Sequence, residues 1–79
     1  MRLEILSLKG IEFEGEAAAF NVKTLSGEIT ILNHHRPMIT ALDKGTARLI
    51  QTDGQEKTIN IKSGFLEMTP HNHLKVLVD

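Results

Sequence analysis

The stretch that decides the fold is Glu28–Leu42, which reads Glu-Ile-Thr-Ile-Leu-Asn-His-His-Arg-Pro-Met-Ile-Thr-Ala-Leu. Two apolar runs rich in β-branched residues, Ile29–Leu32 and Met38–Leu42, lie on either side of a polar corner that ends at Pro37. Proline has no backbone N–H for a β-ladder, and it holds the residue before it in an extended conformation. The stretch is therefore predicted to form a strand, a defined bend and a second strand.

The rest of the chain also favours short strands. Segments 2–5 and 11–14 alternate apolar with charged residues, which is the period of a strand with one solvated face. Gly15 is expected to separate the second of these from a further strand over residues 16–22, and residues 23–27 are turn-like. Two closing strands, over residues 65–68 and 74–78, flank a polar turn.

Asp53-Gly54 is the strongest local hairpin signal in the sequence, because a type I′ turn needs positive φ at both central positions. The strands beside it are predicted over residues 46–52 and 55–61. A two-residue loop would place three isoleucines and two cations on one face of the hairpin, namely Ile50, Ile59, Ile61, Arg48 and Lys57.

These segments predict an all-β fold of about 8 to 10 short strands in a single domain over residues 1–79, as a small sandwich or barrel. No linker, repeat or low-complexity tract interrupts them. In a two-sheet β-sandwich we expect Phe20, Ile31 and Ile50 to gather between the facing sheets.

The composition limits the classes of function. A net charge of −1 gives no long-range attraction for nucleic-acid phosphates, and three Phe with no Tyr or Trp offer few platforms for stacking bases. The lack of cysteine excludes disulfides and thiolate metal sites. No apolar run approaches the roughly 20 residues of a membrane span, and the opening residues lack the apolar core of a signal peptide. We therefore expect the chain itself to be soluble.

Catalysis finds little support in the residues. Glu12, Glu14 and Glu16 form an alternating acidic row, and paired carboxylates serve glycoside hydrolysis. A solvated strand face explains the row more simply, since so small a sandwich offers no deep cleft. No Ser-His-Asp set with helpful context, phosphate-binding Gly-rich loop or activated nucleophile is visible. We predict a protein without catalytic activity.

Four histidines raise the question of a metal site. His71 and His73 would point the same way from an extended chain, and His34 and His35 could supply further imidazoles. Adjacent side chains point apart on a strand, so surface histidines are the default reading and we expect no metal or cofactor. A free-standing ligand- or metal-binding β module stays open as the alternative, motivated by the His34-His35-Arg36 corner.

The residues of the corner before Pro37 favour contact with another protein surface over catalysis. Arg36 and Met38 flank Pro37, and arginine and methionine are favoured at protein interfaces. The competing interpretation, which the sequence leaves open, places Met38 in the core and Arg36 in solvent.

The central stretch resembles the amino-terminal domain of the epsilon subunit of F-type ATP synthases, where Ile-Leu-Pro-Gly-His-Ala-Pro-Leu-Ile-Thr-Ala-Leu is usual. The matching positions are Ile31, Leu32, His35, Pro37, Ile39, Thr40, Ala41 and Leu42, whereas Asn33 and His34 replace Pro-Gly and Arg36 replaces a small residue. Further matches follow in the family's order, at Phe13-Glu14-Gly15, Gly27-Glu28, Asp53-Gly54, Gly64-Phe65-Leu66-Glu67, Thr69-Pro70 and Val76-Leu77.

The resemblance implies a two-sheet β-sandwich that sits on the foot of the gamma subunit, against the ring of c subunits. It implies a non-catalytic rotor subunit that couples ion-driven rotation to ATP synthesis, peripheral to the cytoplasmic face of a bacterial-type membrane. The position of Glu28 would meet the ring, and those of Ser7, His35 and Thr40 would lie along gamma. With the two corner residues, the expected partner interface is Ser7, Glu28, His35, Arg36, Met38 and Thr40.

Two features depart from the family pattern. Lys23–Ser26 occupies a loop that is usually rich in glycine and acidic residues. The sequence also stops at Asp79, about where the family continues into an inhibitory two-helix hairpin. A naturally short version and a truncated one are both compatible with this.

Overall fold

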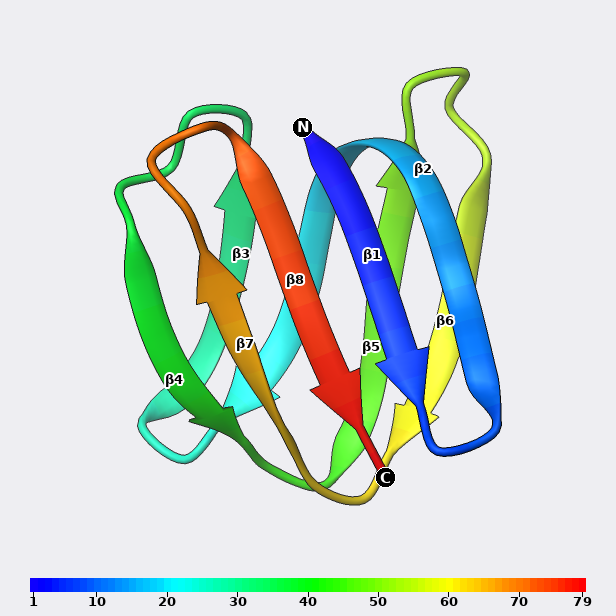
Figure 1. The fold of residues 1–79 in the computed structure, drawn as a ribbon, viewed down its shortest axis with the longest axis vertical. Helices are drawn as coiled ribbons and strands as arrows, with labels where there is room; N and C mark the ends of the chain where they lie inside the picture. The colour runs from blue at the N-terminus through cyan, green and yellow to red at the C-terminus, as the bar shows by residue number, and fades with distance from the viewer.

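The computed structural model describes residues 1–79, which form eight strands (Figure 1). In chain order these are β1 (Arg2–Ser7), β2 (Gly10–Thr24), β3 (Gly27–Leu32), β4 (Met38–Leu42), β5 (Gly45–Gln51), β6 (Glu56–Ile61), β7 (Gly64–Met68) and β8 (His73–Val78). No helix that is long and apolar enough to cross a membrane is found.

Strand β2 joins two facing sheets. Its first half pairs with β1, and its second half pairs with β3 on one side and β5 on the other. The front sheet of Figure 1 therefore runs β4–β7–β8–β1–β2, with β1 and β8 parallel, and the back sheet runs β3–β2–β5–β6. The expected two-sheet β-sandwich is confirmed, with a strand count inside the predicted range.

The bend of β2 replaces the predicted break at Gly15. The strand runs on through this glycine, which pairs with Leu3 of β1, so the expectation of two separate strands was wrong. Glu16 is the last residue that pairs with β1, and Ala17 is the first that pairs with β5. The pairing of β2 with β5 shifts register between Ala17 and Ala19, an irregularity of the kind that bends a strand. The bend carries the strand from one sheet to the other.

The core lies between the sheets and is supplied by alternate residues of every strand. Phe20 and Ile31 are fully buried there, as predicted. Side chains of this kind each contribute about 1.5–3 kcal/mol when they leave water. The buried apolar cluster consists of Met1, Leu3, Ile5, Ala17, Phe20, Val22, Ile31, Leu42, Ala47, Leu49, Ile61, Leu66, Met68, Leu74 and Val76.

The β5–β6 hairpin differs from its prediction by one residue of register. The N–H of Gly54 bonds to the carbonyl of Gln51 at 2.9 Å, and only Gly54 of the central pair has positive φ, at 88°. The loop is therefore one residue longer than a type I′ turn. Because side chains alternate across a strand, this shift turns Leu49 inward and Ile50 outward. The placement of Ile50 in the core was wrong.

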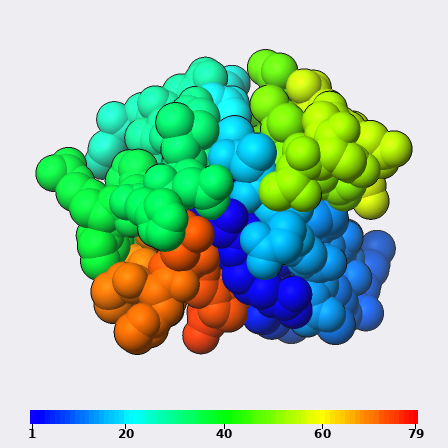
Figure 2. Space-filling view, turned by 90° about the horizontal axis from the view of Figure 1, so that it is seen from above, coloured from blue at the N-terminus to red at the C-terminus, as the bar shows by residue number.

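One end of the sandwich carries the β3–β4 corner, the β5–β6 hairpin and the β7–β8 turn. Figure 2 looks onto this end and shows the first residues of the chain enclosed among these segments. Met1 is accordingly buried. At the opposite end the turn between β2 and β3 is shorter than predicted, because β2 continues to Thr24.

Candidate interaction surface

An apolar row crosses the outer face of the front sheet, which faces the viewer in Figure 1. Directly paired residues of five neighbouring strands form it: Ile11, Leu6, Leu77, Phe65 and Ala41. Phe65 is 61% exposed and Leu77 is 56% exposed, and Ile39 of β4 is 74% exposed beside them. Contiguous apolar surface on a small protein is typical of a contact site.

The row exists because β7 and β8 carry apolar residues on both faces. Leu66 and Val76 are buried beneath the sheet, whereas their neighbours Phe65 and Leu77 point outward. The outward set was not predicted from the sequence. The signal that could have revealed it is the loss of alternation in these two strands, since a one-faced strand would place polar residues at 65 and 77.

Charged residues border the apolar row on the same face. Glu4, Lys75 and Glu67 are paired side by side across β1, β8 and β7. The guanidinium of Arg2 lies 3.2 Å from Glu14 and 3.8 Å from Glu4. The surface thus combines an apolar centre with a charged border, as protein interfaces commonly do.

Two of the predicted interface residues, Ser7 and Thr40, lie in strands β1 and β4 of the front sheet. Ser7 ends β1, where its hydroxyl donates to Glu12 at 3.0 Å and accepts from the N–H of Lys9 at 3.1 Å. Thr40 of β4 pairs with the buried Leu66 and is itself half-buried, so its side chain points to the inner side of the sheet and away from the apolar row.

The corner residues lie at the end of the sandwich, beside β4. Arg36 is exposed, and His35 is half-buried with its Nδ1 2.9 Å from the carbonyl of Arg36. Met38 is half-buried and packs against the core cluster. The structure therefore favours the reading in which Met38 serves packing while Arg36 faces solvent.

Glu28 lies apart from the other candidates. It is the second residue of β3, on the back sheet, directly after the β2–β3 turn. Its carboxylate accepts a hydrogen bond from the side-chain amide of Asn21 at 3.1 Å. Any contact through Glu28 must therefore be separate from one through the front sheet.

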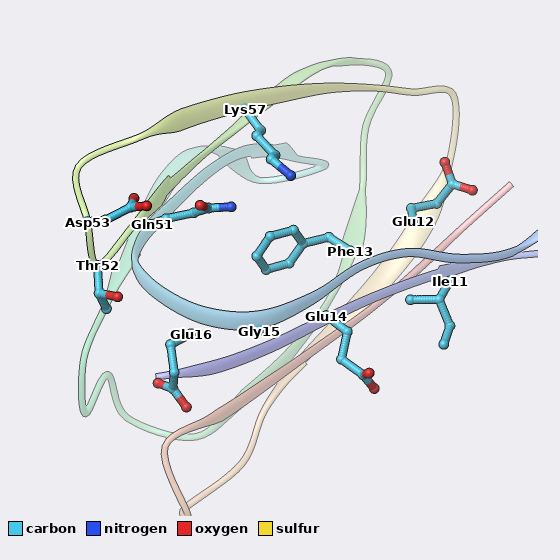
Figure 3. Close-up of a pocket in the computed structure, with 10 residues that line it drawn as sticks. All are labelled: Ile11, Glu12, Phe13, Glu14, Gly15, Glu16, Gln51, Thr52, Asp53 and Lys57. Atoms are coloured by element: carbon cyan, nitrogen blue, oxygen red, sulfur yellow. The ribbon is translucent and has the colours of Figure 1, made fainter.

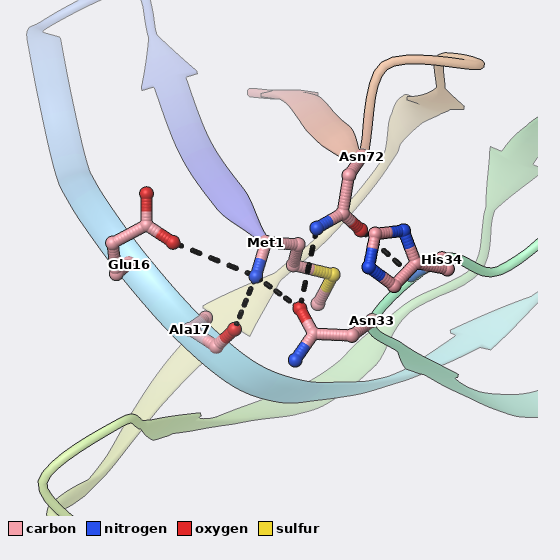
Figure 4. Close-up of polar contacts among 6 residues, drawn as sticks. All are labelled: Met1, Glu16, Ala17, Asn33, His34 and Asn72. Atoms are coloured by element: carbon pink, nitrogen blue, oxygen red, sulfur yellow. Dashed lines mark hydrogen bonds and ion pairs between the residues drawn. The ribbon is translucent and has the colours of Figure 1, made fainter.

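The end of the sandwich shown in Figure 4 gathers several polar groups around Met1. The ammonium group of Met1 donates to the carbonyl of Ala17 at 2.9 Å and to the side-chain oxygen of Asn33, and it lies 3.5 Å from Glu16. Asn72 bonds in turn to the backbone N–H of His34. These contacts tie the start of β1 to the corner.

A groove opens on the side where β2 and β6 face each other without pairing (Figure 3). Phe13 points into it, and the ammonium of Lys57 lies 5.5 Å from the centre of the Phe13 ring. An inward-pointing lysine on an edge strand discourages pairing with another chain. The groove is best explained as a protected sheet edge.

The titrating groups with shifted pKa lie outside the apolar row. The side chains of Arg48 and Glu56 form a two-pronged hydrogen bond, at 3.2 and 3.1 Å, which raises the pKa of Arg48 and lowers that of Glu56. Backbone N–H donation from Ser63 lowers the pKa of Asp79. The first arrangement joins β5 to β6, and the second joins the residue after β8 to the turn between β6 and β7.

Metal ligation finds no support in the geometry. No three histidine or acidic side chains come together in a way that could hold an ion. His73 contacts Glu4 at 3.0 Å, and His34 lies in the corner, so the histidines do not converge. The metal-binding alternative therefore gains nothing from the structure.

The chain is a small two-sheet β-sandwich with an exposed apolar row on its front sheet. Residues 1–79 match the family "ATP synthase, Delta/Epsilon chain, beta-sandwich domain" over their whole length. The chain belongs to this family, as the resemblance indicated. It is 33% identical over 79 residues to the ATP synthase epsilon chain of Shouchella clausii, and it spans 58% of the length of that relative.

Solved structures share the fold. A chain of the Euglena gracilis mitochondrial ATP synthase, in a structure of OSCP, F1 and the c-ring, superposes with a TM-score of 0.90 at 19% identity, over 96% of this chain and 48% of that one. A chain from the central stalk and c-ring of the Tetrahymena thermophila enzyme gives 0.81 at 14% identity, over 99% of this chain and 62% of that one.

Proposed function

We propose that this chain is a non-catalytic component of the central stalk of an F-type ATP synthase. It binds the gamma subunit through the outer face of the front sheet and the c-ring through the end that carries Glu28. In this role it helps to couple rotation of the ring to ATP synthesis. Within the complex it is peripheral to the cytoplasmic face of a bacterial-type membrane.

The observation that carries the proposal is the apolar row from Ile11 to Ala41. Its exposed members would remain in contact with water unless a partner covered them. Family membership supplies the class of partner.

The mechanical part of the proposal follows from the fold. Torque passes between ring and shaft without slip only if the element between them resists deformation. The two sheets share β2 and are joined again where Thr24 pairs with Leu42, so hydrogen bonding continues from one sheet into the other. A sandwich joined in this way is stiff, which suits a transmitting element.

The direct test is binding of the purified cognate gamma subunit, measured by calorimetry. Leu77→Glu places a charge in the apolar row, and we expect it to weaken binding about 30-fold, the effect of losing one central contact. Leu32→Glu is the matched control, because Leu32 is 56% exposed like Leu77 but lies in β3 on the back sheet. Equal effects of the two variants, or no wild-type complex at micromolar concentrations, would refute the proposal.

Two further variants test the margins of the contact. Arg36→Glu should weaken the gamma complex while the isolated domain keeps its melting temperature, because Arg36 is exposed. Equal loss of folding and binding would show that this position serves the fold. Glu28→Lys tests the ring contact separately: we expect it to reduce assembly with the c-ring and to leave gamma binding unchanged.

A further inference from the structure

Asn72 connects three segments of the chain at the end of the sandwich (Figure 4). It lies in the turn between β7 and β8. Its backbone carbonyl accepts from the N–H of Arg2 in β1 at 3.1 Å. Its side-chain oxygen accepts from the N–H of His34 at 2.6 Å, and its side-chain amide donates to Asn33 at 3.4 Å. A single residue thus contacts the first strand, its own turn and the corner.

The corner needs such support because its local sequence does not favour its conformation. The N–H of His35 bonds to the carbonyl of Leu32 at 3.1 Å, which closes a four-residue turn. His34 is the third residue of this turn and has φ of 63°. Glycine or asparagine is favoured at such a position, whereas a histidine is strained there. Contacts from outside the turn must therefore hold it.

We propose that Asn72 is a positioning residue for the partner contact. By accepting a hydrogen bond from the N–H of His34, Asn72 holds His34 in its positive-φ conformation. This fixes the positions of His35 and Arg36 beside the front sheet. The part of this inference that concerns a partner rests on the proposed binding of gamma. The positioning itself is a property of the chain alone and is measurable without a partner.

Two substitutions distinguish the effect of the Asn72 side chain from the effect of its backbone conformation. Asn72 itself has φ of 57°, so an alanine there would strain the turn as well as delete the contact. Asn72→Gly keeps the left-handed backbone and removes the side chain. Asn72→Asp keeps the oxygen that accepts from His34 and also tolerates the left-handed conformation. Only the first should release the corner.

Amide hydrogen exchange in the 79-residue chain gives the first readout. Asn72→Gly should raise the exchange rate of the His35 N–H roughly fivefold, which corresponds to one lost hydrogen bond. Asn72→Asp should leave it within about twofold. The N–H of Gly54 is the internal control, because its bond to Gln51 lies in the separate β5–β6 hairpin and should exchange equally in all variants. An unchanged His35 rate in Asn72→Gly would overturn the positioning role.

Binding of purified gamma gives the second readout. We expect Asn72→Gly to weaken binding about fivefold and Asn72→Asp to retain the wild-type affinity. Faster exchange at His35 with unchanged affinity would overturn the link between the corner and the partner. If the wild-type chain itself fails to bind gamma, the proposed function is wrong, whereas the exchange result still decides the positioning of the corner.

Discussion

Gly64 offers the sharpest test of how the front sheet is built, through the substitution Gly64→Ala. This residue opens β7 and pairs with Leu42 on one side and Val78 on the other. A Cβ added at Gly64 would lie 2.1 Å from the carbonyl oxygen of Leu77. The obstacle is backbone, which cannot move aside by changing a rotamer, so β7 and β8 must separate locally.

We expect this substitution to destabilise the protein by about 3 kcal/mol, the upper end of the range for overpacking. For a domain of this size that loss lowers the melting temperature by about 12–24 °C. Thermal unfolding followed by circular dichroism measures the shift. Because Gly64 directly precedes Phe65, separation of the strands also disturbs the apolar row, and binding of gamma should weaken together with stability.

Gly15→Ala is the matched control for Gly64→Ala. A Cβ at Gly15 would meet the ring of Phe13 at 3.4 Å, an ordinary contact. An alanine there also reduces the freedom of the unfolded chain, so we expect a melting temperature equal to or slightly above that of the wild type. If Gly64→Ala melted within about 2 °C of the wild type, the close approach of β7 and β8 would be refuted.

Three further predictions concern register, the corner and acid. Leu49→Ala should lower the free energy of unfolding by about 2–4 kcal/mol, and Ile50→Ala by less than about 1 kcal/mol, as measured from urea midpoints. The reverse order would support the two-residue hairpin loop instead. His34→Gly should stabilise the domain by about 1 kcal/mol, because glycine adopts positive φ without strain, and an unchanged or lower melting temperature would contradict this. The pKa values of Glu56 and Asp79 are lowered in the folded protein from their ordinary values of 4.5 and 3.8. The contacts of the two carboxylates therefore stabilise the fold fully at pH above those ordinary values. This stabilisation is lost as the pH falls through the lower pKa values of the folded state. Acid should therefore reduce the melting temperature less in Asp79→Asn than in the wild type, and equal reductions would count against this.

Much of the fold could be predicted because alternation and turn residues act locally. Phe20 and Ile31 were placed in the core from period-two patterning, and the bend before Pro37 followed from proline geometry. The interface residues that came from family resemblance, among them Ser7 and Thr40, stay predictions. Both lie in strands of the front sheet, β1 and β4.

The centre of that face could not be predicted in the same way. Phe65 and Leu77 lie in consecutive strands joined by a short turn. Nothing in either segment says that β8 also pairs with β1 or that β7 also pairs with β4. A row across five strands exists only after the sheet has formed, so its members look like isolated apolar residues in the sequence.

The sequence by itself determined which segments become strands, where the chain turns and which residues have the chemistry of a contact surface, because these depend on neighbours within a few positions. The tertiary structure decided the bend of β2 from one sheet to the other, the inward side of β5 and the assembly of the apolar row. Each of these depends on pairing between distant segments. A register shift of one residue leaves local propensities unchanged but exchanges the buried and exposed faces of a strand.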